Sequence, residues 1–140
     1  MFVGVANHNL TVVELDAEYA QPYVTQTVIV APGQTTNVLL TADHPGHRQY
    51  SIAASVYSPA DPSLVAFPTI PAIAILRYSG ASTAISQSIA LPEFPAFNDT
   101  AYALNFTKAL RGQPFSQGFY YYDIPQTIDE DLLFTISYAT

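Results

Sequence analysis

The chain has 140 residues, of which 49% are apolar and 11% charged, so it can build the core of one ordinary domain and is not expected to be disordered. Four Lys and Arg residues against eleven Asp and Glu give a net charge of −7, which argues against a nucleic acid or an anionic membrane as partner. Because the sequence contains no cysteine, it has neither a disulfide framework nor a thiolate metal site.

The first 80 residues predict about six β-strands and show no helix pattern. Runs rich in Val, Ile, Thr and Tyr alternate with turn-forming residues such as Asn7-His-Asn and Pro32-Gly33. Pro22 is expected to interrupt the chain before the third strand. The strands are predicted at residues 2–6, 10–15, 24–31, 35–41, 49–57 and 72–78, the last of them buried. This pattern favours an all-β fold, a Greek-key β-sandwich.

Three carboxylates, Glu14, Asp16 and Glu18, alternate with Leu15 and Ala17. A period of two predicts that the three acids share one face of an extended segment. Such a face could bind a cation or orient a small polar ligand, but a solvated strand face is the favoured interpretation.

The composition changes after Tyr78. Small polar residues and the two prolines of Leu91-Pro-Glu-Phe-Pro predict an irregular connector that lies along a surface. Asn98-Asp-Thr100 predicts the N-cap of one short α-helix at residues 101–111, which Gly112 would end. Beyond this helix, residues 113–126 predict an aromatic loop, and residues 132–138 predict one more strand.

The histidines are the first candidates for a metal site. His44 and His47 flank Pro45-Gly46, but two imidazoles supply at most half of a site, so a solvated turn is favoured. His8 lies in the Asn7-His-Asn9 turn and is expected to hydrogen-bond to the backbone there. We therefore predict no metal ligand.

Two further clusters have a functional and a structural interpretation. Tyr120-Tyr-Tyr122 could line a groove that accepts an aromatic ligand, although aromatic side chains that cover a connector are favoured. Asp129-Glu-Asp131 is interpreted as a charged lead-in to the last strand. Because neither a nucleophile elbow nor a Gly-rich phosphate loop occurs, we predict no catalytic and no cofactor-binding residue.

Three sequons predict possible glycosylation at Asn9, Asn98 and Asn105. Glycosylation would suit a secreted protein. The sequence from Met1 to His8, however, has neither the basic nor the long apolar region of a signal peptide, so we expect no signal peptide in this chain.

Several long blocks resemble plant laccases, which are multicopper oxidases. Asn7-His-Asn-Leu-Thr-Val-Val-Glu and Ile29-Val-Ala-Pro-Gly-Gln-Thr-Thr-Asn-Val-Leu-Leu resemble the second cupredoxin domain of that family. Leu91-Pro-Glu-Phe-Pro-Ala-Phe and Ala103-Leu-Asn-Phe-Thr-Lys resemble the segment that leads to the third domain. Asp129-Glu-Asp-Leu-Leu-Phe-Thr-Ile-Ser-Tyr resembles the opening strand of that third domain.

The resemblance implies a division of the chain. Residues 1–80 would be an incomplete second cupredoxin (plastocyanin-like) domain that lacks its first strands. Residues 81–127 would be the inter-domain connector, and residues 128–140 the opening strand of the third domain. The rest of the laccase would be the partner, and the parent enzyme would be secreted to the apoplast.

The resemblance also implies what the parent does and what this chain lacks. Laccases oxidise phenols, lignin precursors included, at a blue copper and reduce dioxygen to water at a copper cluster. The blue site needs a cysteine thiolate, and the cluster is held by His-x-His pairs; the sequence contains neither. We therefore expect a structural segment without copper and without oxidase activity of its own. The alternative is a non-enzymatic, truncated interaction protein that self-associates through open sheet edges.

Overall fold

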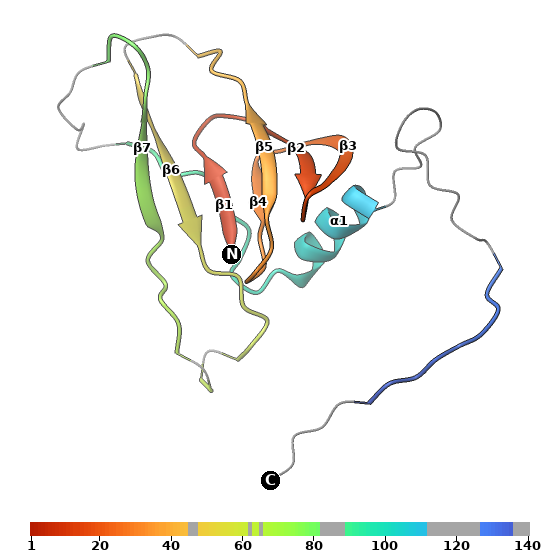
Figure 1. The fold of residues 1–140 in the computed structure, drawn as a ribbon. Coiled ribbons are helices and arrows are strands. Elements are labelled where there is room, and N and C mark those ends of the chain that lie inside the picture. Colours follow the sequence, from red (N-terminus) through yellow and green to blue (C-terminus); the bar gives the residue numbers. More distant parts are fainter. Residues whose placement is uncertain (45–47, 62, 65, 82–88, 112–126, 136–140) are drawn as a thin grey trace.

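The computed structural model describes residues 1–44, 48–61, 63–64, 66–81, 89–111 and 127–135. Within these residues the chain forms two antiparallel sheets with one helix beside them (Figure 1). The elements are β1 (Phe2–Val5), β2 (Leu10–Leu15), β3 (Glu18–Thr25), β4 (Thr27–Ile29), β5 (Thr36–Leu40), β6 (Gln49–Ser55), β7 (Ala72–Arg77) and α1 (Thr100–Arg111). This architecture agrees with the predicted cupredoxin-like sandwich.

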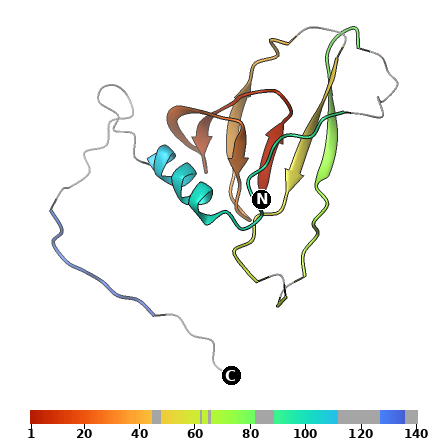
Figure 2. The same ribbon diagram turned by 180° about the vertical axis from the view of Figure 1, so that it is seen from behind.

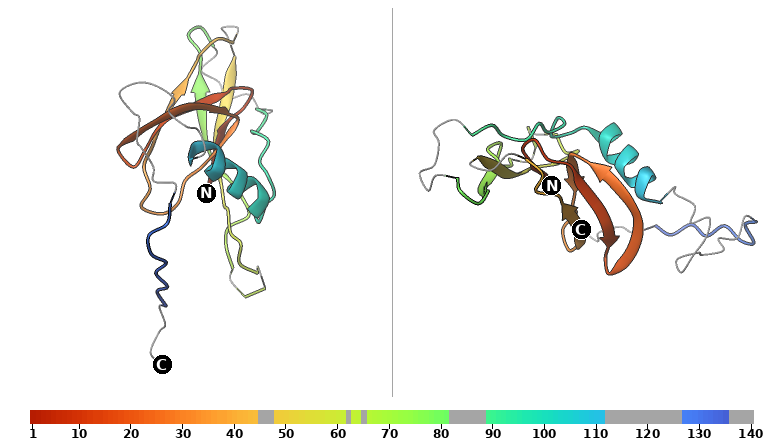
Figure 3. Two further views of the ribbon diagram at one scale, coloured as in Figure 1. Left: turned by 90° about the vertical axis from the view of Figure 1, so that its right-hand side faces the viewer. Right: turned by 90° about the horizontal axis from the view of Figure 1, so that it is seen from above.

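The two sheets pack face to face around one core (Figure 3). The first sheet has the strand order β4-β1-β6-β7 and the second has the order β3-β2-β5. Val5 and Val28 of the first sheet meet Leu10 and Val12 of the second, and Phe106 of α1 completes this buried cluster. The helix therefore belongs to the core, although its other residues are mostly exposed or half-buried.

The predicted strand at residues 24–31 is wrong in one respect, because it is two strands in two different sheets. The chain leaves the second sheet at Thr25 and enters the first at Thr27, with Gln26 between them. The Thr25 hydroxyl donates to the Thr27 carbonyl at 3.0 Å and accepts from the Thr27 N–H at 3.3 Å. This local pairing replaces ladder hydrogen bonds where the chain changes sheets.

The predicted shared face of Glu14, Asp16 and Glu18 is also wrong. Asp16 and Ala17 have φ values of 49° and 68° and form a two-residue turn between β2 and β3, with Leu15 paired to Glu18. Such positive φ values at both central residues are the requirement of a tight hairpin turn. The three acids therefore alternate in the sequence only; in the structure they lie on β2, in the turn and on β3.

Pro22 does not interrupt the chain but lies within β3. β3 is at the edge of its sheet, where a residue without an N–H is tolerated. The β2–β3 register shifts between Val12 and Glu14, opposite this part of β3. The irregular pairing accommodates the proline without ending the strand.

One predicted strand is exposed where burial was expected, and another is absent from its described part. β7 was expected to be buried, but it is the edge strand of the first sheet, and Ile73 is 54% exposed. The strand predicted at residues 132–138 is absent from its described part, residues 132–135, where Leu133 is 92% exposed. Residues 136–138 lie outside the described residues.

The predicted helix is confirmed. The Asp99 carboxylate accepts a hydrogen bond from the Tyr102 N–H at 2.8 Å and caps α1, which contributes about 1 kcal/mol.

Residues 89–99 run across the outer face of the first sheet before they reach α1 (Figure 2). A Cβ atom at Gly4 would lie 3.2 Å from side-chain atoms of Pro92 and Phe94, so a larger residue there would require the connector to shift by a few tenths of an ångström. No helix in the described part of the chain is long and apolar enough to cross a membrane.

Candidate functional site

The polar side chains with the most elaborate contacts gather at the turn between β1 and β2. Asn7 has a φ of 61°, a conformation that asparagine tolerates, and this turn directs His8 back into the protein. His8 is 3% exposed. Its Nδ1 lies 2.7 Å from the Ala6 carbonyl oxygen, and its Nε2 lies 2.8 Å from the Tyr78 hydroxyl.

These two contacts fix the tautomer of His8. A carbonyl oxygen only accepts hydrogen bonds, so Nδ1 must carry the proton and donate it to Ala6. In the tautomer that carries its proton on Nδ1, Nε2 accepts from the Tyr78 hydroxyl. Both ring nitrogens are thus used inside the fold. The prediction that His8 bonds to the backbone in its turn is confirmed.

His44 packs beside His8. Their ring centroids are 4.5 Å apart, and Tyr50 contacts both rings at 4.7 and 5.3 Å. The His44 Nε2 donates to the Asn7 carbonyl, and its backbone N–H lies 3.4 Å from the Tyr78 hydroxyl. Residues 45–47 of the predicted solvated turn lie outside the described residues. The His44 side chain itself is 32% exposed and tethers the segment after β5 to the β1–β2 turn.

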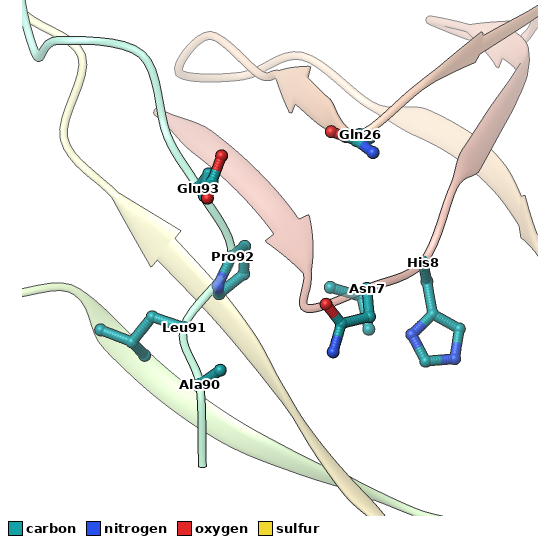
Figure 4. Close-up of a pocket in the computed structure, with 8 residues that line it drawn as sticks. Asn7, His8, Gln26, Ala90, Leu91, Pro92 and Glu93 are labelled. Carbon is teal, nitrogen blue, oxygen red and sulfur yellow. The ribbon is translucent and has the colours of Figure 1, made fainter. Parts of the chain in front are cut away.

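A polar recess of about 320 Å³ opens next to this cluster (Figure 4). The recess is lined from three segments: the connector (Pro92 and Glu93), the β1–β2 turn (Asn7 and His8) and the link between β3 and β4 (Gln26). Amide and carboxylate groups of this kind can hydrogen-bond a small polar molecule. They include no nucleophile paired with a base, so the recess offers no catalytic constellation.

The carboxylates of the β2–β3 hairpin act within the fold. Glu14 accepts from the Asn37 amide at 2.6 Å, and Asp16 accepts from the Thr35 N–H at 2.9 Å. The first bond ties the hairpin to β5, and the second ties it to the residue just before β5. Glu18 is exposed on β3. The structure brings two of the three acids to separate polar partners rather than to one cation site.

The remaining predicted site residues are solvent-exposed or lie outside the described residues. Asp129, Glu130 and Asp131 are exposed and have no regular secondary structure. His47 and residues 120–122 are outside the described residues. In the part of the chain that the structure describes, no group of three or more His, Cys, Asp or Glu side chains could hold a metal ion.

The three sequon asparagines share exposure but differ in local structure. Asn9 precedes β2, Asn98 lies before the helix cap and Asn105 lies on α1, and all three are exposed. The Thr107 hydroxyl of the third sequon donates to the Ala103 carbonyl at 2.9 Å. Burial therefore does not prevent the modification of any of the three asparagines.

Sequence reasoning missed the contact between His8, His44 and Tyr78. His8 and Tyr78 are 70 positions apart, and no local pattern relates them. The only signal was that a histidine stood between two apolar strands, where a buried polar ring needs partners.

Comparison with known proteins gives a consistent result. The Multicopper oxidase family model matches residues 1–81. "Putative laccase-17" of Oryza sativa subsp. japonica is 43% identical over 136 residues, and "Laccase-13" of Arabidopsis thaliana is 43% identical over 141 residues. Each match covers 97% of this chain but only 22% or 23% of the relative. The chain thus spans less than a quarter of the length of these two relatives.

Proposed function

Because the chain belongs to the multicopper oxidase family, we propose that it is a structural segment of a laccase-like enzyme and binds no copper itself. The parent would oxidise phenols and reduce dioxygen to water, in the apoplast, with the remaining laccase domains as partners of this segment. Residues 1–80 would form part of the second cupredoxin domain, and the later residues would lead to the third.

The donor set does not fit copper. A blue copper site takes a cysteine thiolate and two imidazoles. The chain has no cysteine and three histidines in all. No step of the parent's reaction is therefore assigned to a residue of this chain.

The proposal rests on the observation that both nitrogens of the His8 ring are hydrogen-bonded inside the fold. Nδ1 donates to Ala6 and Nε2 accepts from Tyr78, at 2.7 and 2.8 Å, in a position that is 3% exposed. To bind a metal, the ring would have to give up a buried hydrogen bond and leave its partner unsatisfied, at a cost of about 1–3 kcal/mol. This imidazole supports the fold instead.

A copper titration tests the proposal. The purified chain is titrated with Cu(I) and Cu(II), followed by visible absorbance and metal analysis, and then assayed for phenol oxidation with oxygen consumption. We expect no stoichiometric copper and no turnover above a buffer control. Stoichiometric binding that is lost in His8→Asn or His44→Asn would contradict it, because those histidines would then be ligands.

The second candidate function is a non-enzymatic interaction protein. It is favoured by β7, an edge strand of the first sheet on which Ile73 is 54% exposed. Open edges of this kind pair with other strands. Size-exclusion chromatography over a concentration series separates the two candidates, because a chain that stays monomeric argues against association through this edge.

A further inference from the structure

β7 leaves one side of the first sheet open. The Ala6 N–H donates to the Ser51 carbonyl at 2.9 Å, so the backbone of Ser51 faces β1 rather than β7. Ile75, which pairs with Ser51, therefore turns its own N–H and C=O away from β6, and Ile73 repeats this direction two residues earlier. Among the described residues no strand lies beyond β7, so this edge can accept one more strand.

The two faces of β7 carry different side chains. Leu76 packs against the buried cluster, so Ala74, two residues earlier, lies on the same inner face, where it is exposed. The outer face carries Ile73, Ile75 and Arg77, and Ile73 is 54% exposed. A strand added here would meet a small side chain on the inner face and two isoleucines followed by a cation on the outer face.

Residues 129–135 have the composition of a strand but no regular secondary structure. Their sequence is Asp129-Glu-Asp-Leu-Leu-Phe-Thr135. Leu132, Leu133 and Phe134 are 69%, 92% and 80% exposed, and the segment runs away from the two sheets (Figure 1). Three adjacent apolar side chains in water, on an extended backbone, favour addition to an open sheet edge.

We infer that residues 131–135 of one copy of this chain pair antiparallel with β7 of a second copy. Charge sets the direction, because an antiparallel strand places Asp131 beside Arg77. The guanidinium has five N–H donors, so it can bind this carboxylate in addition to other partners. A parallel strand of the same length would place the acids beside Ala72, at the end of β7 that carries no Lys or Arg.

The pair of Asp131 and Arg77 also determines the register of the whole strand. Apolar side chains of the segment then meet Ile75 and Leu76, and its largest side chain lies beside the small Ala74. The complete set of pairs is Asp131–Arg77, Leu132–Leu76, Leu133–Ile75, Phe134–Ala74 and Thr135–Ile73. A shift by one residue would instead turn Asp131 to the inner face beside Leu76, so the chosen register is the one that keeps the charge on the outer face.

The partner is a second copy because of where the segment leaves the fold. The segment follows α1 in the chain, and α1 lies on the far side of the sandwich from β7 (Figures 1 and 3). A second copy can present its β7 without the segment passing around its own sandwich. Two copies that exchange segments form a closed dimer, since each supplies one strand and one edge. The inference rests on the second candidate function, association through β7, and names the segment that pairs there.

A charge exchange tests the register and the second copy together. The full chain is purified as wild type, Asp131→Arg and Arg77→Asp, and size-exclusion chromatography with light scattering over a concentration series gives the dissociation constant of the dimer. Each single variant places like charges opposite each other in both pairs and should raise this constant about tenfold or more. An equimolar mixture of the two variants should form a heterodimer within about threefold of the wild-type constant, because both pairs again join opposite charges.

Two variants in the exposed segment serve as controls that leave the sheets unchanged. Asp129→Arg makes the same change in charge opposite Ser79, beyond the end of β7, and should stay within about threefold of the wild-type constant. Leu133→Pro removes the N–H that would bond to the Ile75 carbonyl and should give a monomer. Circular dichroism of every variant reports whether the fold is kept, and the segment variants remain decisive if Arg77→Asp unfolds.

The outcomes separate this inference from the proposed functions. A wild-type chain that is monomeric at every concentration, or a mixture as weak as its two components, would overturn the inference. A dimer that persists in Leu133→Pro but is lost in Ile75→Pro would also overturn it and would leave the second candidate function intact, because β7 would then pair with something other than this segment. A positive copper titration would overturn the first candidate function without changing any of these results.

Discussion

The two sheets differ in what covers their outer faces. On the first sheet, the connector lies over β1, and Phe2 is completely buried between Tyr57, Phe94 and Tyr102. On the second sheet nothing among the described residues covers the corresponding side, and Leu39 is 60% exposed. Large apolar side chains on the outer faces of the two sheets thus end in opposite environments, because the irregular connector covers one face.

The cover over the first sheet is held by polar bonds as well as by apolar contact. The Ser51 hydroxyl donates to the Ala90 carbonyl at 2.5 Å, and the Thr27 hydroxyl lies 3.4 Å from the Glu93 carbonyl. The Tyr102 hydroxyl of α1 donates to the Thr27 carbonyl at 2.8 Å. Sheet hydroxyls thus satisfy carbonyls of a segment that has no ladder of its own.

The largest effect is expected for Phe2→Ala. Phe2 is 0% exposed and its ring meets those of Tyr57, Phe94 and Tyr102 at centroid distances of 5.4, 6.4 and 5.9 Å. Loss of this ring should lower the free energy of unfolding by about 3–5 kcal/mol. Urea unfolding of the full chain, followed by tyrosine fluorescence and circular dichroism, measures it. A loss below about 1 kcal/mol would mean that the connector does not seal this face.

Gly4→Ala should come next. The added Cβ would lie 3.1 Å from the Gln26 carbonyl oxygen and 3.2 Å from atoms of Phe94 and Pro92, so the connector must move. We expect a loss of about 1–3 kcal/mol in the free energy of unfolding. In a Phe94→Ala background the cost of Gly4→Ala should fall, since one of the close neighbours is gone. Equal costs in both backgrounds would show that Phe94 is not the limiting neighbour, which leaves Pro92 and the Gln26 carbonyl oxygen.

The sequence predicted most elements but not their assignment to sheets. β1, β2, β5, β6 and α1 lie within two residues of their predicted positions, because turn residues and the Asp99 cap act locally. The split of residues 24–31 was missed, since Val and Thr residues typical of strands lie on both sides of Gln26 and only the tertiary structure places the two halves in different sheets. The Asp16-Ala17 turn was missed because it contains neither Gly nor Asn, the usual residues at positive φ.

The candidate site was predicted only in part. The bond from His8 to backbone follows from its position in a short turn and was anticipated. Its second partner, Tyr78, comes from the far end of the first sheet and depends on strand order, which the sequence pattern does not contain. The same limit applies to His44, for which a solvated turn was predicted and whose ring packs against that of His8, 36 positions earlier in the sequence.

A smaller effect is expected at the helix that ends the connector. Asp99→Ala removes the oxygen that accepts the Tyr102 N–H at 2.8 Å and should cost about 1 kcal/mol. Asn98→Ala is the matched control, because the side chain next to the cap is exposed. Thermal unfolding by circular dichroism should separate the two variants. Equal melting temperatures would indicate that α1 is held by Phe106 and Tyr102 rather than by its cap.

The smallest effect is expected on the uncovered face. Leu39→Thr changes a side chain that is 60% exposed and should alter the free energy of unfolding by no more than about 0.5 kcal/mol. Leu40→Thr, one residue further along β5, is the sharper comparison, because Leu40 packs against the buried cluster and its replacement should cost well above about 1 kcal/mol. If the two substitutions cost the same, the outer face of the second sheet is covered after all and the contrast between the sheets fails. If they differ as expected, β5 has one face that stabilises the fold and one that is free to contact something else.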